Sequence, residues 1–118
     1  MINKVIMVNG ADKRVTLVEG VIRLICRECA NGTYSLDNPD NCYNNSGNNI
    51  GTLEEVTQIV DALEQWEGGP DKTLEINLLN HQVKFHMDDG GDRYLIIGCT
   101  AILLADAKAV LTGLCRLT

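Results

Sequence analysis

Alternating apolar and polar positions in the first third of the chain predict a run of antiparallel strands. Turn-forming segments separate four such strands, at 2–8, 14–19, 21–29 and 33–37. The first has apolar residues on both faces, which is typical of a central strand covered on two sides. In the third strand, Ile22, Leu24 and Cys26 share one face, which we expect to be the core face. Arg23 and Arg27 share the opposite face.

Asn31-Gly32 lies between the third and fourth predicted strands. Because both residues tolerate a positive φ, this pair predicts a two-residue hairpin turn of type I′. Residues 38–51 follow, with many Asn, Gly and Ser residues and no periodicity. We expect them to form a long Asn-rich loop, a kind of segment that is often functional.

The first predicted helix begins at a capping box formed by Thr52 and Glu55, whose side chains can satisfy each other's free backbone amides. Apolar residues then recur at helical spacing and form one stripe: Leu53, Val56, Ile59, Val60, Leu63 and Trp66. Gly68-Gly69-Pro70 is expected to end the helix. This pattern predicts an amphipathic helix that packs on a sheet.

Two further strands, at 73–79 and 82–87, flank a predicted turn at Asn80-His81. That turn sets a register in which three apolar pairs face each other: Leu78 with Val83, Ile76 with Phe85, and Leu74 with Met87. The same register places Glu75 opposite His86. Another strand, at 93–98, is expected after the "DDGGD" turn.

The C-terminal segment from Thr100 to Leu114 predicts a second helix, with Asp106, Lys108 and Thr112 on its outer face. Its apolar arc is wide for a helix on one sheet, which indicates a two-sided core or an oligomer contact. The predicted order is therefore ββββαβββα. This is an α+β fold with a mostly antiparallel sheet and two helices, in a single domain spanning 1–118.

Composition and charge narrow the classes of function. With 118 residues, 45% hydrophobic and 22% charged, the chain is typical of one globular domain. A net charge of −6 argues against nucleic-acid binding, which needs clustered Lys and Arg. Cys99 to Ala105 is too short an apolar run to cross a membrane. The N-terminus has no secretory signal pattern, so we expect a cytoplasmic protein without a membrane partner.

Three of the five cysteines, Cys26, Cys29 and Cys42, lie close together in the sequence. Thiolates two residues apart can share a zinc ion, with a fourth ligand from His81, His86 or Cys99. On a regular strand, however, Cys26 and Cys29 point to opposite faces. We therefore expect structural thiols and no cofactor, and keep a zinc-stabilised domain as an alternative.

The sequence offers little support for catalysis. His86, opposite Glu75 in the predicted register, is better explained by cross-strand charge pairing than by a catalytic role. The chain has no nucleophile elbow, phosphate-binding loop, dinucleotide fingerprint or zinc-protease motif. Enzymatic activity is possible but lacks a supporting motif, and no catalytic residue is assigned.

Arg23, Arg27 and Tyr34 are the candidate ligand-binding residues. They are predicted to lie near one hairpin and the Asn-rich loop, where charge and aromatic stacking can bind a small anion. A solvated sheet face is the simpler interpretation of the same residues.

No motif identifies a family. A compact acidic α+β chain without catalytic residues is typical of small accessory proteins of phages and other mobile elements. We therefore expect a non-catalytic protein-interaction domain that is a homo-oligomer, associating through the C-terminal helix or a sheet edge. A small-molecule binder for an anionic ligand is the main alternative.

Overall fold

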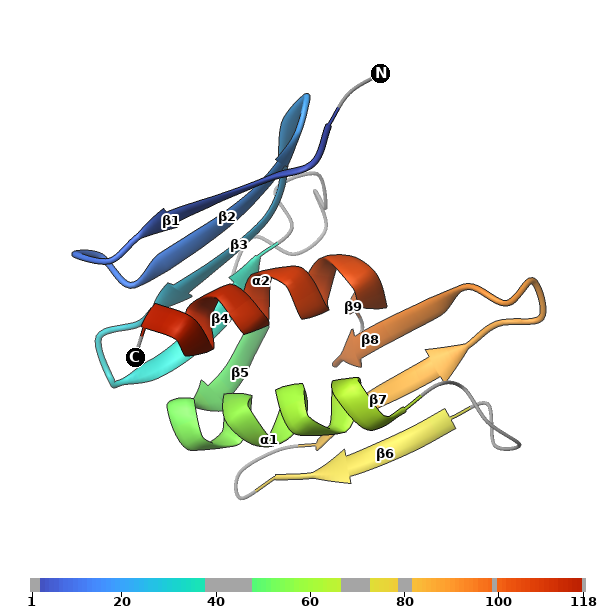
Figure 1. Ribbon diagram of the computed structural model, residues 1–118. Coiled ribbons are helices and arrows are strands. Elements are labelled where there is room, and N and C mark those ends of the chain that lie inside the picture. Colours follow the sequence, from blue (N-terminus) through green and yellow to red (C-terminus); the bar gives the residue numbers. More distant parts are fainter. Residues whose placement is uncertain (1–2, 38–47, 67–72, 79–81, 99, 118) are drawn as a thin grey trace.

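The structure, a computed structural model, describes residues 3–37, 48–66, 73–78, 82–98 and 100–117. Two antiparallel sheets and two helices follow one another in the order βββββαββββα (Figure 1). The predicted α+β class is confirmed, and the structure adds one strand before each helix. The first sheet contains, in order, β1 (Val5–Asn9), β2 (Arg14–Glu19), β3 (Val21–Glu28), β4 (Thr33–Asp37) and β5 (Asn48–Thr52). The second contains β6 (Thr73–Asn77), β7 (Gln82–Met87), β8 (Arg93–Ile97) and β9 (Thr100–Leu103).

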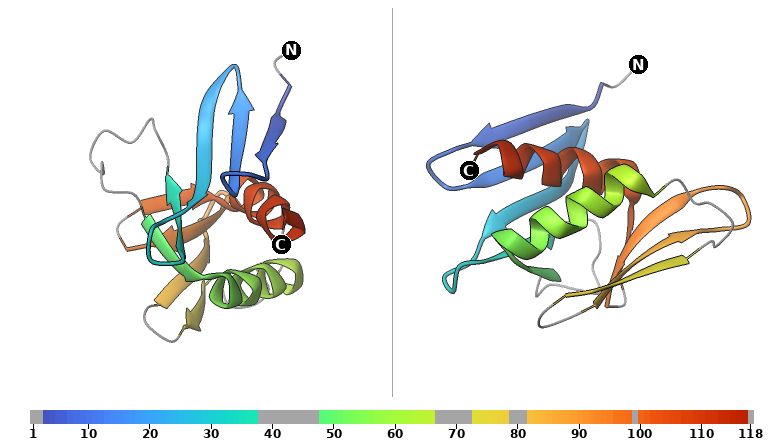
Figure 2. Two further views of the ribbon diagram at one scale, coloured as in Figure 1. Left: turned by 90° about the vertical axis from the view of Figure 1, so that its left-hand side faces the viewer. Right: turned by 60° about the horizontal axis from the view of Figure 1, so that its bottom comes forward.

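The helices α1 (Leu53–Gln65) and α2 (Leu104–Leu117) lie side by side on one side of the sheets (Figure 2). Between these layers, apolar side chains from both sheets and both helices form the core, with the largest fully buried ones including Phe85, Leu17, Leu24 and Leu111. Among the described residues, no helix is long and apolar enough to cross a membrane.

The first predicted strand is β1, and its predicted central position is wrong. Among the described residues, β1 pairs with β2 alone, so it forms one edge of the first sheet. The apolar residues on both faces of this strand predict that other elements cover both faces. In the structure α2 lies beside one face, and every residue of β1 remains exposed.

The hairpin between β3 and β4 forms at the predicted place with a different turn. Cys29 donates its backbone N–H to the carbonyl of Thr33 at 2.7 Å, and Gly32 donates to the carbonyl of Cys29 at 3.1 Å. Gly32 has a φ of 79°, whereas Asn31 is not among the residues with positive φ. This is a three-residue loop with glycine in the left-handed position, in place of the two-residue type I′ turn.

The predicted loop at 38–51 is partly a strand. Asn48 to Thr52 form β5, which pairs with β4 and leads directly into α1. Residues 38–47 lie outside the described part of the chain. At the junction, Glu55 donates its N–H to Thr52 Oγ1 at 3.3 Å, and the Thr52 N–H donates to Glu55 Oε1 at 3.1 Å. The capping box is thereby confirmed.

The predicted register between β6 and β7 is wrong by two residues. Leu74 lies opposite Phe85 and Ile76 opposite Val83, whereas Glu75 lies opposite Lys84 and not His86. β6 ends at Asn77, two residues earlier than predicted, whereas β7 has the predicted bounds. The predicted turn at Asn80-His81 falls outside the described residues. Because side chains alternate with a period of two, a shift of two residues leaves the core face unchanged.

The predicted helix from Thr100 begins four residues too early. Residues 100–103 form β9, which pairs with β8, and α2 starts at Leu104. The helix predicted from Thr100 has a wide apolar arc because it combines residues of β9 with residues of α2. Asp106, predicted on the outer face, is buried in the first turn of α2.

Candidate functional site

The exposed edge of the first sheet is the most unusual surface of the described chain. Val5, Ile6, Met7 and Val8 are 51%, 37%, 58% and 52% exposed. They are consecutive residues of β1 and none carries a charge. On the side away from β2, no described strand pairs with their backbone groups, which present a template for another strand. Their side chains present apolar surface to water on both faces.

The other three sheet edges are more polar or shorter. Edge strand β5 has the sequence NNIGT, which is rich in polar residues and glycine. Edge strand β6 carries Glu75, which pairs with Lys84 at 3.7 Å. Edge strand β9 has four residues and continues into α2. Charged residues, bulges and short length are common ways of preventing association at a sheet edge. β1 has no charged residue, and its pairing with β2 has no bulge.

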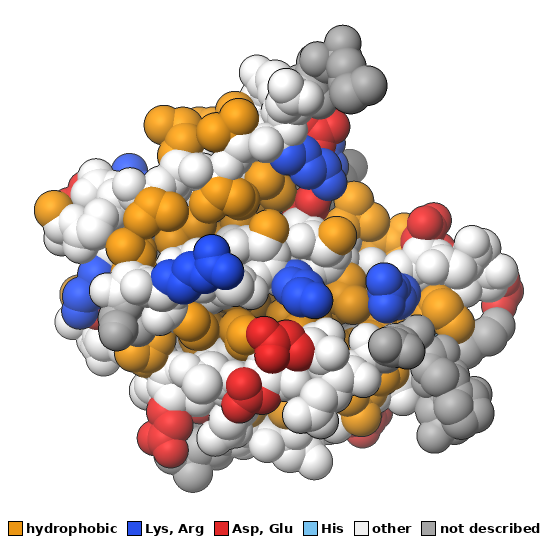
Figure 3. Space-filling model, viewed as in Figure 1, with side chains coloured by type: hydrophobic (Ala, Val, Ile, Leu, Met, Phe, Trp, Pro, Cys, Tyr) orange, Lys and Arg blue, Asp and Glu red, His pale blue; other side chains and the backbone are white. Residues whose placement is uncertain are grey.

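A groove of about 570 Å³ lies between β1 and α2. Ile6 and Val8 form its β1 wall, since they pair with buried residues of β2 that lie under the helix. The α2 wall consists of Ala105, Lys108, Ala109, Thr112, Gly113, Arg116 and Leu117. Figure 3 shows hydrophobic side chains gathered along β1 and in this hollow. We call the groove together with the exposed residues of β1 the β1 surface.

Small residues shape the α2 wall of the β1 surface. A Cβ atom on Gly113 would lie 3.2 Å from Val15 Cγ1 and 3.8 Å from Ile6 Cγ2, so glycine allows α2 to approach the sheet closely. The charged side chains lining the groove are basic, Lys108 and Arg116, and both are exposed. The wall is therefore apolar near the strand and basic toward solvent.

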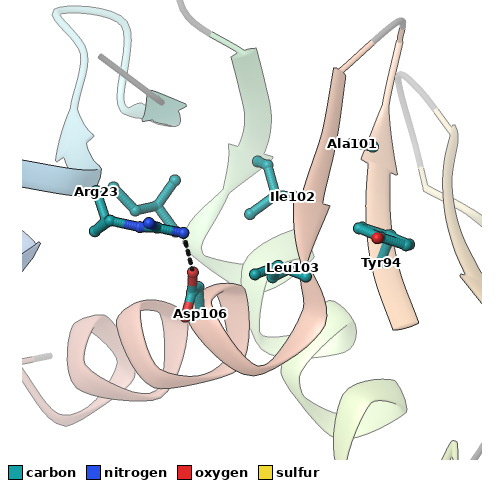
Figure 4. A pocket seen from close by; sticks show the side chains of 7 residues that line it. Arg23, Tyr94, Ala101, Ile102, Leu103 and Asp106 are labelled. Atoms are coloured by element: carbon teal, nitrogen blue, oxygen red, sulfur yellow. Dashed lines mark ion pairs between the residues drawn. The ribbon is translucent and has the colours of Figure 1, made fainter. Parts of the chain in front are cut away.

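Arg23, a predicted ligand-binding residue, lies at a bulge in β3. Leu17 pairs with Leu24 and Val18 pairs with Ile22, so Arg23 is skipped in the ladder. Bulges re-aim side chains. Arg23 thus reaches α2, where its Nη2 lies 3.8 Å from Asp106 Oδ2 (Figure 4). The predicted shared face with Arg27 is wrong for this reason, and Ile22, predicted in the core, is 45% exposed.

The other two predicted ligand-binding residues lie elsewhere. Arg27 donates from Nε to Asp37 Oδ2 at 3.3 Å on the neighbouring strand β4. Tyr34 is only 2% exposed, and its hydroxyl donates to Glu28 Oε2 at 3.3 Å. Burial and the neighbouring Glu28 carboxylate both raise the pKa of Tyr34. The structure does not bring the three predicted residues into one site, and the buried Tyr34 ring has no open face for stacking.

Arg23 instead borders a hollow of about 270 Å³ where the first sheet meets β9. The hollow is lined by Arg23, Leu24, Tyr94, Ala101, Ile102, Leu103 and Asp106 (Figure 4). The Arg23 guanidinium forms an ion pair with Asp106 at the border of this hollow. Desolvation is the largest cause that raises the pKa of Tyr94, and the nearby Asp88 and Asp92 carboxylates raise it further.

The predicted zinc ligands are only partly visible. Cys26 is fully buried on the core face of β3, where desolvation and nearby acidic groups raise its pKa to about 12. Cys29 is a free thiol in the β3–β4 loop. No group of three or more potential metal ligands occurs among the described residues. Cys42, His81 and Cys99 lie outside them, so the zinc hypothesis is still a prediction.

Comparison of the chain with protein-family models, curated proteins and solved structures found no match. The site must therefore be interpreted from its own geometry. Sequence reasoning missed Ile6, Val8 and Tyr94. A signal for the first two was present, because the first strand of an antiparallel meander is at an edge unless a later strand pairs with it. No comparable signal pointed to Tyr94.

Proposed function

We propose that this protein is a non-catalytic protein-interaction domain that binds through the β1 surface. The observation that carries this proposal is the run of four exposed, uncharged, apolar residues on an edge strand, Val5 to Val8. Burying apolar surface contributes about 25 cal/mol per Å². Strand pairing adds backbone hydrogen bonds to that contribution, and this combination is a recurring mode of protein recognition.

A photo-cross-linking residue placed at Met7 in living cells tests the proposal. We expect a discrete covalent adduct when the probe replaces Met7 and a much weaker one when it replaces Val21. The two native side chains are similarly exposed, at 58% for Met7 and 59% for Val21. The same probe in an Ile6→Lys background should lose the adduct, because lysine puts a charge into the apolar wall. The absence of any position-specific adduct would contradict the proposal.

Leu74→Lys is the matched control for Ile6→Lys. Both residues are 37% exposed on edge strands, and both lie opposite a buried core residue. Leu74→Lys should keep the adduct at position 7. Equal loss in both variants would indicate general destabilisation of the sheets and would overturn the assignment to the β1 surface.

The biological setting is part of the proposal. We propose a cytoplasmic accessory protein of a phage or other mobile element, supported by the small acidic α+β chain alone. Neighbouring genes of phage or transposon type would support this setting, whereas a conserved metabolic operon would contradict it. Cell fractionation tests the compartment.

The hollow beside Arg23 favours a second candidate function, the binding of a small anion. The supporting observation is the β3 bulge at Arg23, which borders a hollow that is also lined by Tyr94 and apolar side chains. Arginine and a carboxylate form strong charge-assisted hydrogen bonds, and bulges are common beside binding sites. This candidate replaces Tyr34 with Tyr94 and omits Arg27.

A further inference from the structure

We infer that the occupant of the β1 surface is an extended segment of another protein, with two acidic residues four positions apart and an apolar residue midway between them. This inference rests on the proposed function and names the chemistry of the partner. The segment pairs as a strand with β1, which is a common mode of peptide recognition. The acidic and apolar side chains on one face of the segment then enter the groove between β1 and α2.

The groove is basic although the whole chain has a net charge of −6. The described residues that line it include Lys108 and Arg116 and no acidic residue. Neither cation forms an ion pair with any residue that the structure describes. Other cations do form such pairs, namely Lys4, Lys13, Arg23, Arg27 and Lys84. Two cations without an acidic neighbour, beside an apolar wall, are complementary to a partner that brings carboxylates together with apolar side chains.

Strand β1 and helix α2 run side by side in the same direction (Figure 1). Lys108 therefore lies toward the start of the groove and Arg116 toward its end. Three contacts occur in the same order along both elements and establish this direction: Lys4 with Asp106, Ile6 with Gly113, and Gly10 with Leu117.

The spacing of the two cations matches the period of a strand. Lys108 and Arg116 are separated by eight residues, about 12 Å along the axis of α2. Strand residues at positions i and i+4 point to the same face and lie about 13 Å apart. Two acidic residues at these positions can therefore reach both cations, while an apolar residue at i+2 packs beside Ile6 and Val8. Because the pattern is symmetric, it fits a parallel or an antiparallel strand.

Two labelled peptides of identical composition test this spacing on the purified full-length chain. The first, Thr-Thr-Asp-Val-Leu-Val-Glu-Thr-Thr, has its acidic residues four positions apart. The second, Thr-Thr-Val-Asp-Leu-Glu-Val-Thr-Thr, has them two apart, too close to reach both cations. In fluorescence-anisotropy titrations the first peptide should bind at least about tenfold more tightly, a difference of about 1.4 kcal/mol. Equal affinities would overturn the inference.

Charge variants of the chain test which cations the first peptide contacts. Lys108→Gln/Arg116→Gln should weaken its binding at least about tenfold. Arg14→Gln/Arg93→Gln is the matched control and should keep most of the affinity. It makes the same change in net charge at two exposed cations that form no ion pair with a described residue and lie outside the groove lining. Equal weakening in the two double variants would show attraction by net charge alone and would overturn the inference.

Hydrogen exchange tests whether the peptide pairs with the strand. Binding of the first peptide should slow amide exchange in β1 and leave the other edge strand β6 unchanged. Protection that excludes β1 would overturn strand pairing as the mode of binding.

A second copy of this chain, the homo-oligomer expected from the sequence, is the competing occupant. Two copies repel through their net charge and through their basic grooves. A wild-type dimer in light scattering that Ile6→Lys converts to a monomer would nevertheless favour the second copy and overturn the acidic partner. If the first peptide does not bind but the adduct at position 7 forms in cells, this inference falls and the proposed function stands. Absence of the cellular adduct would overturn the proposed function, and the inference with it.

Discussion

Lys4 Nζ lies 3.0 Å from Asp106 Oδ1 and donates a hydrogen bond that joins the segment before β1 to the first turn of α2. The Asp106 side chain is only 8% exposed, and the Arg23 guanidinium approaches its other oxygen at 3.8 Å. One carboxylate therefore connects the edge strand, the β3 bulge and the helix. The β1 surface and the hollow beside Arg23 both depend on the position of Asp106, since residues of α2 line each of them.

Asp106→Asn should lower the free energy of unfolding by about 1–2 kcal/mol. The substitution removes a charge-assisted hydrogen bond and a negative charge near the N-terminus of α2, where the helix dipole favours it. The partial exposure of Lys4 keeps the expected loss small. Urea unfolding followed by circular dichroism measures it. Asp61→Asn, at an exposed position of α1, should change stability by less than about 0.5 kcal/mol, and an equal effect of the two changes would contradict this role.

Thr52→Ala should destabilise the protein by about 1 kcal/mol, because it removes the side chain that caps α1. Thr57→Ala provides the comparison within the same helix. Thr57 is exposed and its hydroxyl donates to the carbonyl of Leu53 at 2.9 Å, a bond that the helix does not need. Thermal melts should separate the two variants. A neutral Thr52→Ala would show that packing of the apolar stripe alone determines where α1 begins.

The elements that depend on local sequence could be predicted, and those that depend on distant pairing could not. The α1 cap and the strand at Arg14–Glu19 occur as predicted, since a capping box and an alternating pattern are contained in a few adjacent residues. The edge position of β1 depends on which strands pair. The period-two pattern alone does not specify this, although the order of an antiparallel meander favours an edge for its first strand. Apolar residues on both faces fit a central strand and also an edge strand that associates with a partner, so this pattern does not distinguish the two.

The candidate site shows the same limit. The sequence identified Arg23, but its direction depends on a bulge that shifts the register between Leu17 and Val18. Without the bulge, alternation places Arg23 on the same strand face as Arg27, as predicted. Tyr94, on β8, lines the same hollow although it follows Arg23 by 71 residues in the sequence. Only the packing of the second sheet against the first brings them together.

Burial of Cys26 predicts a measurable pH dependence of stability. Its pKa is raised from 9.0 to about 12, so the folded state keeps a proton that the unfolded state releases. The contribution of the buried Cys26 thiol to the free energy of unfolding is complete below pH 9. It is lost as the pH rises toward 12, by about 1.4 kcal/mol per pH unit. Chemical denaturation at a series of pH values should show a steeper loss above pH 9 for wild type than for Cys26→Ala. Equal slopes would contradict the burial of this thiol.

Benzoate, a flat carboxylate, probes the hollow beside Arg23. In the wild-type chain, we expect titration to shift the backbone amide resonances of Tyr94, Ala101 and Leu103, which line the hollow. Arg23→Ala should weaken this binding by at least about tenfold, since a hydrogen bond to a charged group contributes about 1.5–3 kcal/mol. Arg27→Ala is the matched control, because it removes the same charge from the same strand, where Arg27 pairs with Asp37 at 3.3 Å. Equal weakening in both variants would show that benzoate responds to net charge alone, and shifts confined to other residues would place its site elsewhere.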